Sequence, residues 1–104
     1  MGSQENYMQR TTLELNGLYK EVTTHTKTLK IIANKHRLLI LCTLAHGEMS
    51  VGQINDVVPL GQSSLSQHLG RLREGNLVST RRDKQTIYYR LTGNQAALVI
   101  EALQ

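Results

Sequence analysis

A stretch rich in serine and glutamine, GQSSLSQHLGRLRE, occupies residues 61–74. Its leucines follow one another at spacings of four and three, which predicts a helix with one narrow apolar stripe. That stripe consists of Leu65, Leu69 and Leu72. The opposite face carries hydroxyls and amides, with no acidic residue before Glu74. Short polar side chains on a helix can hydrogen-bond base edges and phosphates in the DNA major groove, because they let the helix backbone come close.

Four residues in the first turns of this helix are the primary candidates for DNA contact: Gln62, Ser63, Ser66 and Gln67. A glutamine amide can bond adenine through two hydrogen bonds, and a serine hydroxyl can donate to a base or a phosphate. An ordinary amphipathic helix with a serine-rich exposed face is the alternative. Serine is a mediocre helix former inside a helix, so its repetition favours use in binding.

Residues 61–90 account for the whole net charge of +4, because they contain six basic residues and two acidic ones. The basic residues are Arg71, Arg73, Arg81, Arg82, Lys84 and Arg90, and the acidic ones are Glu74 and Asp83. Such clustering predicts a polyanionic partner. The alternative is a solvated basic surface with no partner.

Two strand-like segments, LVSTRR and TIYYRL, flank the short sequence DKQ and predict a β-hairpin. Arg81, Arg82 and Lys84 lie at or beside the predicted turn, where they could contact the phosphate backbone or enter the minor groove. Tyr88 and Tyr89 point to opposite faces of a strand, and we favour packing against the core for both.

The elements before this region are helical. An apolar stripe at steps of three and four predicts a first helix, with a start near Thr11 or Thr12 and with residues 1–10 flexible. Its members are Leu15, Leu18, Val22, His25, Leu29 and Ile32. We favour a packing role for His25 over a ligand role, since no second ligand lies one turn away.

Three further helices complete the pattern. Residues 35–45 predict a central, buried helix that begins after Asn34 and stops at Gly47. Residues 51–57 predict a short helix capped by Ser50, and Pro59 separates it from the serine-rich helix in a helix-turn-helix arrangement. Residues 94–103 predict a last helix whose apolar side consists of Ala96, Ala97, Ile100 and Leu103. The whole chain, residues 1–104, is then a single, mainly helical domain with one hairpin.

Length and composition restrict the class of protein. A chain of 104 residues fits one domain, and its single cysteine, Cys42, excludes an intrachain disulfide and indicates a reducing compartment. The longest apolar run, residues 38–42, is too short to span a bilayer, and we see no signal peptide. We therefore expect a soluble cytoplasmic protein without a membrane partner.

The segments KHRLLILCTLAHGEMSVGQI and GQSSLSQHLGRLREGNLVSTRRDKQTIYYRL together closely resemble the ArsR/SmtB family of bacterial transcriptional regulators. The resemblance covers residues 31–91 and includes the serine-rich recognition helix and the RR…YYxL wing. It implies a winged helix-turn-helix and a dimeric repressor that binds double-stranded operator DNA. The implied DNA contacts are Gln62, Ser63, Ser64, Ser66, Gln67, His68, Arg71, Arg81, Arg82 and Lys84. The implied dimer contacts, on the first and last helices, are Leu15, Leu18, Val22, Leu29, Ile100 and Leu103.

The sensor sites implied by the resemblance are incomplete. Metal-sensing relatives carry thiols in the segment that reads MSVGQIND here, or ligands on the last helix, where Glu101 stands alone. We therefore predict no metal and no cofactor. Cys42 matches one cysteine of a sulfur-responsive branch, but this chain has no second cysteine. We favour an inert core thiol over a redox-active one, and the inducer stays unidentified.

Two other classes of function remain as alternatives. Ser64 and His68 superficially offer a nucleophile and a base, but no orienting carboxylate or oxyanion device accompanies them, so we predict no enzymatic activity. A protein-interaction module with weak, non-specific DNA binding is the stronger alternative. Measured DNA affinity and sequence preference separate that module from a repressor.

Overall fold

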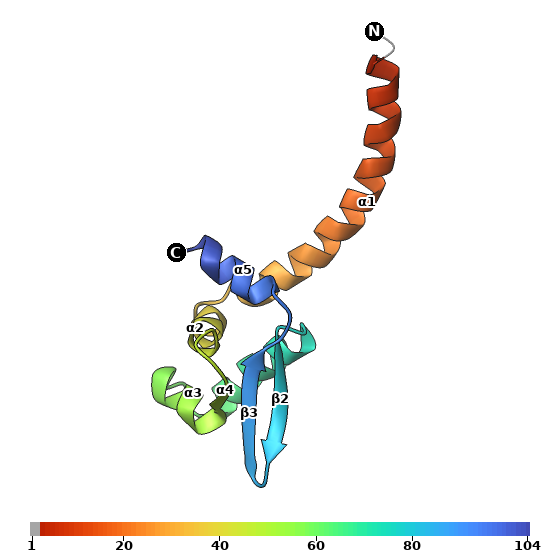
Figure 1. Cartoon of the computed structure of the whole chain (residues 1–104). Coiled ribbons are helices and arrows are strands. Elements are labelled where there is room, and N and C mark those ends of the chain that lie inside the picture. The colour runs from red at the N-terminus through yellow and green to blue at the C-terminus, as the bar shows by residue number, and fades with distance from the viewer. Residues whose placement is uncertain (1–2) are drawn as a thin grey trace.

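The computed structural model describes residues 3–104, with side chains from residue 15 onward. Its elements are, in order, α1 (Ser3–Ile32), α2 (Lys35–Leu44), β1 (Met49–Ser50), α3 (Val51–Val57), α4 (Gln62–Glu74), β2 (Val78–Asp83), β3 (Thr86–Leu91) and α5 (Gln95–Ala102) (Figure 1). The predicted order of four helices, a hairpin and a last helix is confirmed. Strand β1 is an addition that the sequence did not reveal.

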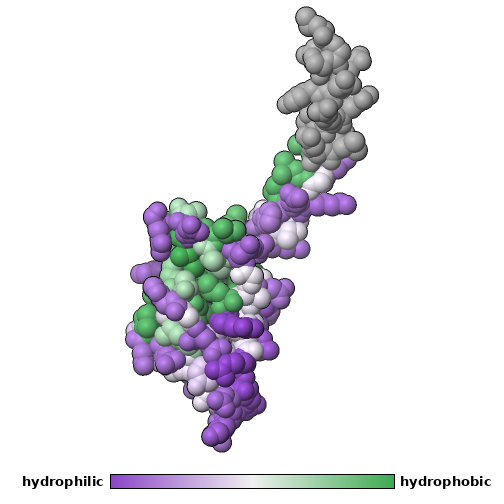
Figure 2. Space-filling view, viewed as in Figure 1, coloured by the Kyte–Doolittle hydropathy of each residue, from purple (hydrophilic) through white to green (hydrophobic). Residues whose placement is uncertain are grey.

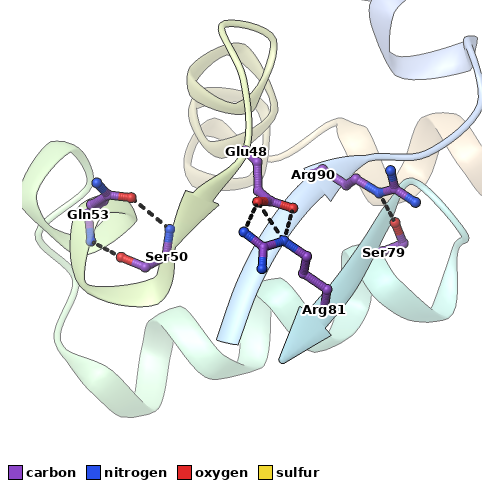
Figure 3. Close-up of polar contacts among 6 residues, drawn as sticks. All are labelled: Glu48, Ser50, Gln53, Ser79, Arg81 and Arg90. Atoms are coloured by element: carbon purple, nitrogen blue, oxygen red, sulfur yellow. Dashed lines mark hydrogen bonds and ion pairs between the residues drawn. The ribbon is translucent and has the colours of Figure 1, made fainter. Parts of the chain in front are cut away.

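Local capping explains where the central helices begin. The Asn34 side chain accepts hydrogen bonds from the backbone N–H groups of His36 and Arg37, and this fixes the start of α2 as predicted. Ser50 and Gln53 form a capping box at the start of α3: Gln53 N donates to Ser50 Oγ at 3.2 Å, and Ser50 N donates to Gln53 Oε1 at 2.9 Å (Figure 3). The N-caps predicted for these two helices are confirmed, whereas the C-cap of α2 is Ala45 and not the predicted Gly47.

The predicted start of α1 is wrong. The helix begins at Ser3 rather than at Thr11 or Thr12, and its backbone is helical through both threonines. The residues before Thr11 include Gln, Glu, Met and Arg, which are good helix formers, and neither Gly nor Pro interrupts residues 3–10. Residues 1–2 lie outside the described part of the chain, and the flexibility expected of residues 1–10 stays a prediction.

The three strands form one antiparallel sheet in the order β1-β3-β2. The hairpin pairs Val78 with Leu91 at its base and Asp83 with Thr86 beside the turn. Lys84, in the turn, has φ of 59°, so a lysine occupies the left-handed conformation. On the other edge of β3, Met49 pairs with Tyr89, and this pairing joins the hairpin to the start of α3.

One apolar core holds the helices and the sheet together. The three leucines of α4 are at most 1% exposed, as the sequence predicted, and they contact a cluster that contains Ile40 and Ile54. Burying a leucine side chain contributes about 1.5–3 kcal/mol, so this stripe fixes the rotation of α4 about its own axis. From α5, Ala96 and Ile100 join the core. The opposite, polar face of α4 must therefore point outward.

Helix α1 extends away from the rest of the molecule (Figure 1). The radius of gyration is 18.5 Å, whereas a compact domain of this length has about 13 Å. Among the side chains of α1 from residue 15 onward, those of Ile31 and Ile32 in the last turn reach the core. The other described stripe residues are exposed in this single chain, and so is His25, which does not pack within its own chain as expected. The predicted apolar side of the last helix divides: Ala96 and Ile100 are buried in the chain's own core, although Ile100 was predicted as a dimer contact, whereas Ala97 and the C-cap residue Leu103 are exposed.

No helix in the described part of the chain combines the length and apolar character that crossing a bilayer requires.

Candidate nucleic-acid interface

The exposed face of α4 carries most of the side chains that the sequence predicted for DNA contact. Gln62, Ser63, Ser64, Ser66, Gln67 and Arg71 are all exposed. The N-cap of α4 is Gly61, with φ of 83° and no side-chain hydrogen bond to the first turn. The first backbone N–H groups of α4 are thus left uncapped by side chains, and such groups at a helix N-terminus attract phosphate.

His68 differs from its neighbours on α4, because it is half-buried and lies against α2. Its Nδ1 atom is 3.3 Å from Nη1 of Arg37, and its ring centroid is 5.6 Å from that of His36. Burial lowers the pKa of His68, and the charges of Arg37 and His36 lower it further. The family resemblance implies that this histidine either supports the recognition helix or contacts phosphate, and its contacts with α2 match support of the helix.

Arg81 on β2 is already bound within the protein. Its Nε atom donates to both carboxylate oxygens of Glu48, at 2.8 and 2.9 Å, and its Nη2 atom lies 2.7 Å from Oε1 (Figure 3). The guanidinium also lies over the ring of Tyr88, 4.3 Å from the centroid. Hydrogen bonding to Glu48 raises the pKa of Arg81. The structure thus gives Arg81 a carboxylate partner, although the sequence predicted a phosphate.

Glu48 is the residue that sequence reasoning missed. It lies 33 residues from Arg81 in the chain, in the loop before β1. Only the pairing of β1 with β3 brings this loop beside the hairpin, and a two-residue strand leaves no periodic signal. Tyr88 and Tyr89 divide as alternate strand residues do: Tyr89 packs against the core, and Tyr88 supports Arg81.

The remaining basic residues lie along the hairpin, whose tip is the strongly hydrophilic end of the molecule (Figure 2). Arg82 Nε donates to the backbone oxygen of Lys84 at 3.1 Å. Arg90 Nε donates to Ser79 Oγ at 3.1 Å, as Figure 3 shows. Among the side chains that the structure describes, no carboxylate pairs with Arg82 or Lys84. Both cations are therefore available to an external anion.

A groove of about 480 Å³ lies between α4 and the hairpin, and the start of α3 also lines it. Polar side chains from both walls line it, including Gln62 and Ser66 from α4 and Gln85 and Thr86 from the hairpin. The helix face and the basic hairpin therefore border one continuous surface. A single extended polyanion can contact both of them, with the groove between.

The candidate sensor residues do not form a cluster among the described side chains. Cys42 is half-buried at the edge of the core, which corrects the expectation of a fully buried thiol. It lies on α2, and its side chain packs beside the cluster that includes Ile40 and Leu41. Within residues 15–104, no three His, Cys, Asp or Glu side chains gather closely enough to hold a metal ion.

Comparison with known proteins identifies the family. The model of the arsR family of bacterial regulatory proteins matches residues 34–80, which include α2, α3 and α4. The chain is 44% identical over 91 residues to the biofilm growth-associated repressor of Agrobacterium fabrum, covering 88% of this chain and 78% of that protein. This chain belongs to the ArsR family. It is therefore a DNA-binding transcriptional regulator with a winged helix-turn-helix fold, in which α4 is the recognition helix and β2–β3 is the wing.

Other members of the ArsR family share both sequence and fold with this chain. The transcriptional activator HlyU of Vibrio cholerae is 39% identical over 97 residues, which cover 93% of this chain and 90% of that protein. The crystal structure of the repressor BigR from Xylella fastidiosa superposes with a TM-score of 0.79 at 41% identity, covering 85% of this chain and 90% of that one. A Mycobacterium bovis fragment, described as a homodimeric winged helix-turn-helix DNA-binding domain, superposes with a TM-score of 0.74 at 31% identity, covering 83% and 80%.

Proposed function

We propose that this ArsR-family regulator works as a homodimer that binds a two-fold symmetric operator and represses transcription from it. The observation that carries the proposal is the exposed polar face of α4 beside a basic wing. The proposed DNA contacts are Gln62, Ser63, Ser64, Ser66, Gln67 and Arg71 on α4, with Arg82 and Lys84 on the wing. We leave Arg81 out of the phosphate contacts because Glu48 already holds it.

The division of labour between helix and wing follows from their chemistry. Glutamine amides read base edges through paired hydrogen bonds, so Gln62 and Gln67 supply sequence preference. Arg82 and Lys84 lie on the wing and not on the recognition helix, and phosphates are the DNA groups that their charges meet there, so they supply sequence-independent affinity. Buried leucines hold α4 rigidly, and this keeps its polar face in a constant orientation toward the DNA major groove.

The dimer is supported by the apolar residues that the single chain leaves exposed. Leu15, Leu18, Val22 and Leu29 are 50–53% exposed along α1, and Leu103 is 66% exposed at the end of α5. An apolar stripe at heptad-like spacing on a projecting helix is typical of a helix that packs on another helix. The M. bovis relative is described as homodimeric, and a second copy is the partner we propose here.

Repression is the proposed direction of control. The A. fabrum relative and BigR are both named repressors, whereas HlyU is named an activator. A protein of this size that covers an operator blocks access to the DNA by occupancy alone, which needs no further surface. We propose no catalytic role, because Ser64 is exposed on α4 while His68 is engaged by Arg37. We also propose a cytoplasmic location, where operator DNA lies in a bacterium.

The proposal is tested by selecting bound duplexes from a random DNA pool and then transcribing from a promoter that contains the selected site. We expect an enriched inverted repeat, and lower transcript yield when the protein is added. Recovery of no sequence preference would support the protein-interaction alternative instead. A higher transcript yield would keep the DNA-binding proposal and overturn repression.

A further inference from the structure

One side chain, Arg37 on α2, joins the end of α1 to the recognition helix α4. Its Nε atom donates to the backbone oxygen of Ile31, in the last turn of α1. Its Nη1 atom lies 3.3 Å from Nδ1 of His68, two turns into α4. The planar guanidinium thus bridges α1 and α4, although His68 lies 31 residues from Arg37 in the chain.

A second contact brings the same two helices together. The C-cap of α4 is Gly75, and a Cβ atom placed on it would lie 2.6 Å from Cδ1 of Ile31. The end of α1 therefore lies directly against the end of α4, and a larger residue at position 75 would require the Ile31 side chain to shift. Since α1 also carries the proposed dimer stripe, this junction connects the dimer helix to the helix that reads DNA.

The Arg37 contact requires one protonation state of His68. Arginine has only donors, so Nδ1 of His68 must be the acceptor and must carry no proton. A protonated imidazole would present an N–H to the guanidinium and add a positive charge beside it. The contact would then change from a hydrogen bond to a repulsion.

We propose that Arg37 and neutral His68 position α4 for DNA binding, and that protonation of His68 releases this contact and weakens DNA binding. The inference rests on the proposed function of α4. Arg37 and His68 are positioning residues here, because the half-buried His68 ring lies against α2, whereas the side chains proposed to touch DNA are exposed.

The groups whose charges act on the His68 ring are Arg37 and His36, both from α2. From α1, Ile31 contributes a carbonyl and an aliphatic side chain, which do not titrate. On α4 itself, Arg71 lies one turn away and pairs with Glu74 at 3.7 Å. The start of β2, also packed on α4, carries uncharged residues. Burial and both α2 charges lower the pKa of His68, so its neutral form prevails above about pH 6.5.

The sign of the effect opposes the general trend for DNA binding. Acidification in general makes the net charge of a protein more positive, which strengthens attraction to phosphate. Release of the Arg37–His68 contact acts in the other direction. At pH 5.5 a protonated His68 must lose its proton before α4 takes its DNA-binding position. Because the pKa of His68 is lowered, this step weakens the affinity by less than about tenfold for each recognition helix. The contribution of His68 to the free energy of unfolding has the same sign. This contribution is fully present above about pH 6.5 and is lost as the pH drops through the folded-state pKa of His68.

The test measures affinity for the duplex selected at pH 7.5, over a pH series from 7.5 to 5.5 at constant ionic strength. His68→Asn keeps an acceptor near the position of Nδ1 but does not titrate. His46→Asn is the matched control, because His46 is exposed in the loop before β1. We expect several-fold weaker binding at low pH for the wild type and for His46→Asn, and constant or tighter binding for His68→Asn.

Two outcomes separate the inference from the function on which it rests. Failure of the wild type to select any duplex at pH 7.5 would refute the proposed function and the inference with it. Selection at pH 7.5, followed by the same pH profile for wild type and His68→Asn, would overturn the inference alone. Arg37→Lys retains the charge but not the planar bridge, so we expect several-fold weaker binding at pH 7.5 and a shallower pH profile. Unchanged affinity in that variant would also contradict the inference.

Discussion

The Glu48–Arg81 pair leads to a prediction about which wing cations meet DNA. An arginine that donates through Nε and Nη2 to one carboxylate, at 2.7–2.9 Å, brings no free charge to a phosphate. Lys84, at the hairpin turn, has no such partner among the described side chains. We therefore predict that neutralising these two neighbours by Arg81→Gln and Lys84→Gln changes the salt dependence of DNA binding differently.

The magnitude follows from the number of phosphates neutralised. Each phosphate contact contributes about 0.9 to the slope of log affinity against log salt concentration. A dimer presents two wings, so Lys84→Gln should flatten the slope by up to about 1.8, while Arg81→Gln should leave it unchanged. Loss of the Glu48–Arg81 ion pair in Arg81→Gln can weaken DNA binding, but by an equal factor at every salt concentration.

Fluorescence anisotropy on the selected duplex, titrated at several potassium chloride concentrations, measures both slopes. Glu48→Gln provides the control, because it frees Arg81 from its carboxylate and should steepen the slope. Equal flattening by Arg81→Gln and Lys84→Gln would refute the reasoning, since it would mean that Arg81 leaves Glu48 to bind phosphate.

Four further predictions concern the recognition helix, the dimer, the helix junction and the thiol. Gln62→Ala or Gln67→Ala should cost about 1–3 kcal/mol on the selected site and much less on random duplex, measured by competition binding; an equal loss on both duplexes would remove the reading role. Leu18→Glu should produce a monomer in sedimentation at micromolar concentration, because the dimer would bury two unpaired carboxylates. An intact dimer would show that Leu18 lies outside the interface. Gly75→Ala should cost about 1 kcal/mol of unfolding free energy through the Ile31 overlap, and adding Ile31→Val should restore it in thermal melts; no restoration would point to another contact. Cys42→Ser should keep operator affinity within about threefold, at a cost of about 1 kcal/mol in stability, and stoichiometric zinc or peroxide should not release DNA; release by either agent in the wild type, absent in Cys42→Ser, would identify the thiol as a sensor.

The features that the sequence predicted are those encoded by neighbours in the chain. Each of these features depends on residues that are close together in the chain. They are the leucine stripe of α4, the caps at Asn34 and Ser50, and the hairpin. The exposure of the α4 polar residues then follows from burial of the leucines. These local patterns sufficed for the fold and for the helix part of the candidate interface.

The features that were missed depend on tertiary contacts. Glu48 meets Arg81, and Arg37 meets His68, across separations of 33 and 31 residues. No periodicity connects such pairs, and their meeting depends on how β1 docks on β3 and how α2 packs on α4. The start of α1 differs for another reason: Thr11 and Thr12 are typical cap residues and predict a boundary, although good helix formers continue before them.

Footprinting of the selected duplex with hydroxyl radicals tests the central claim most directly. A homodimer that inserts one α4 into each half-site predicts two protected segments related by two-fold symmetry, with centres one helical turn of DNA apart or a multiple of it, about 10 base pairs per turn. Replacing Gln62 and Gln67 together should abolish both segments at once. A single asymmetric segment, or protection that does not depend on these two side chains, would contradict the account.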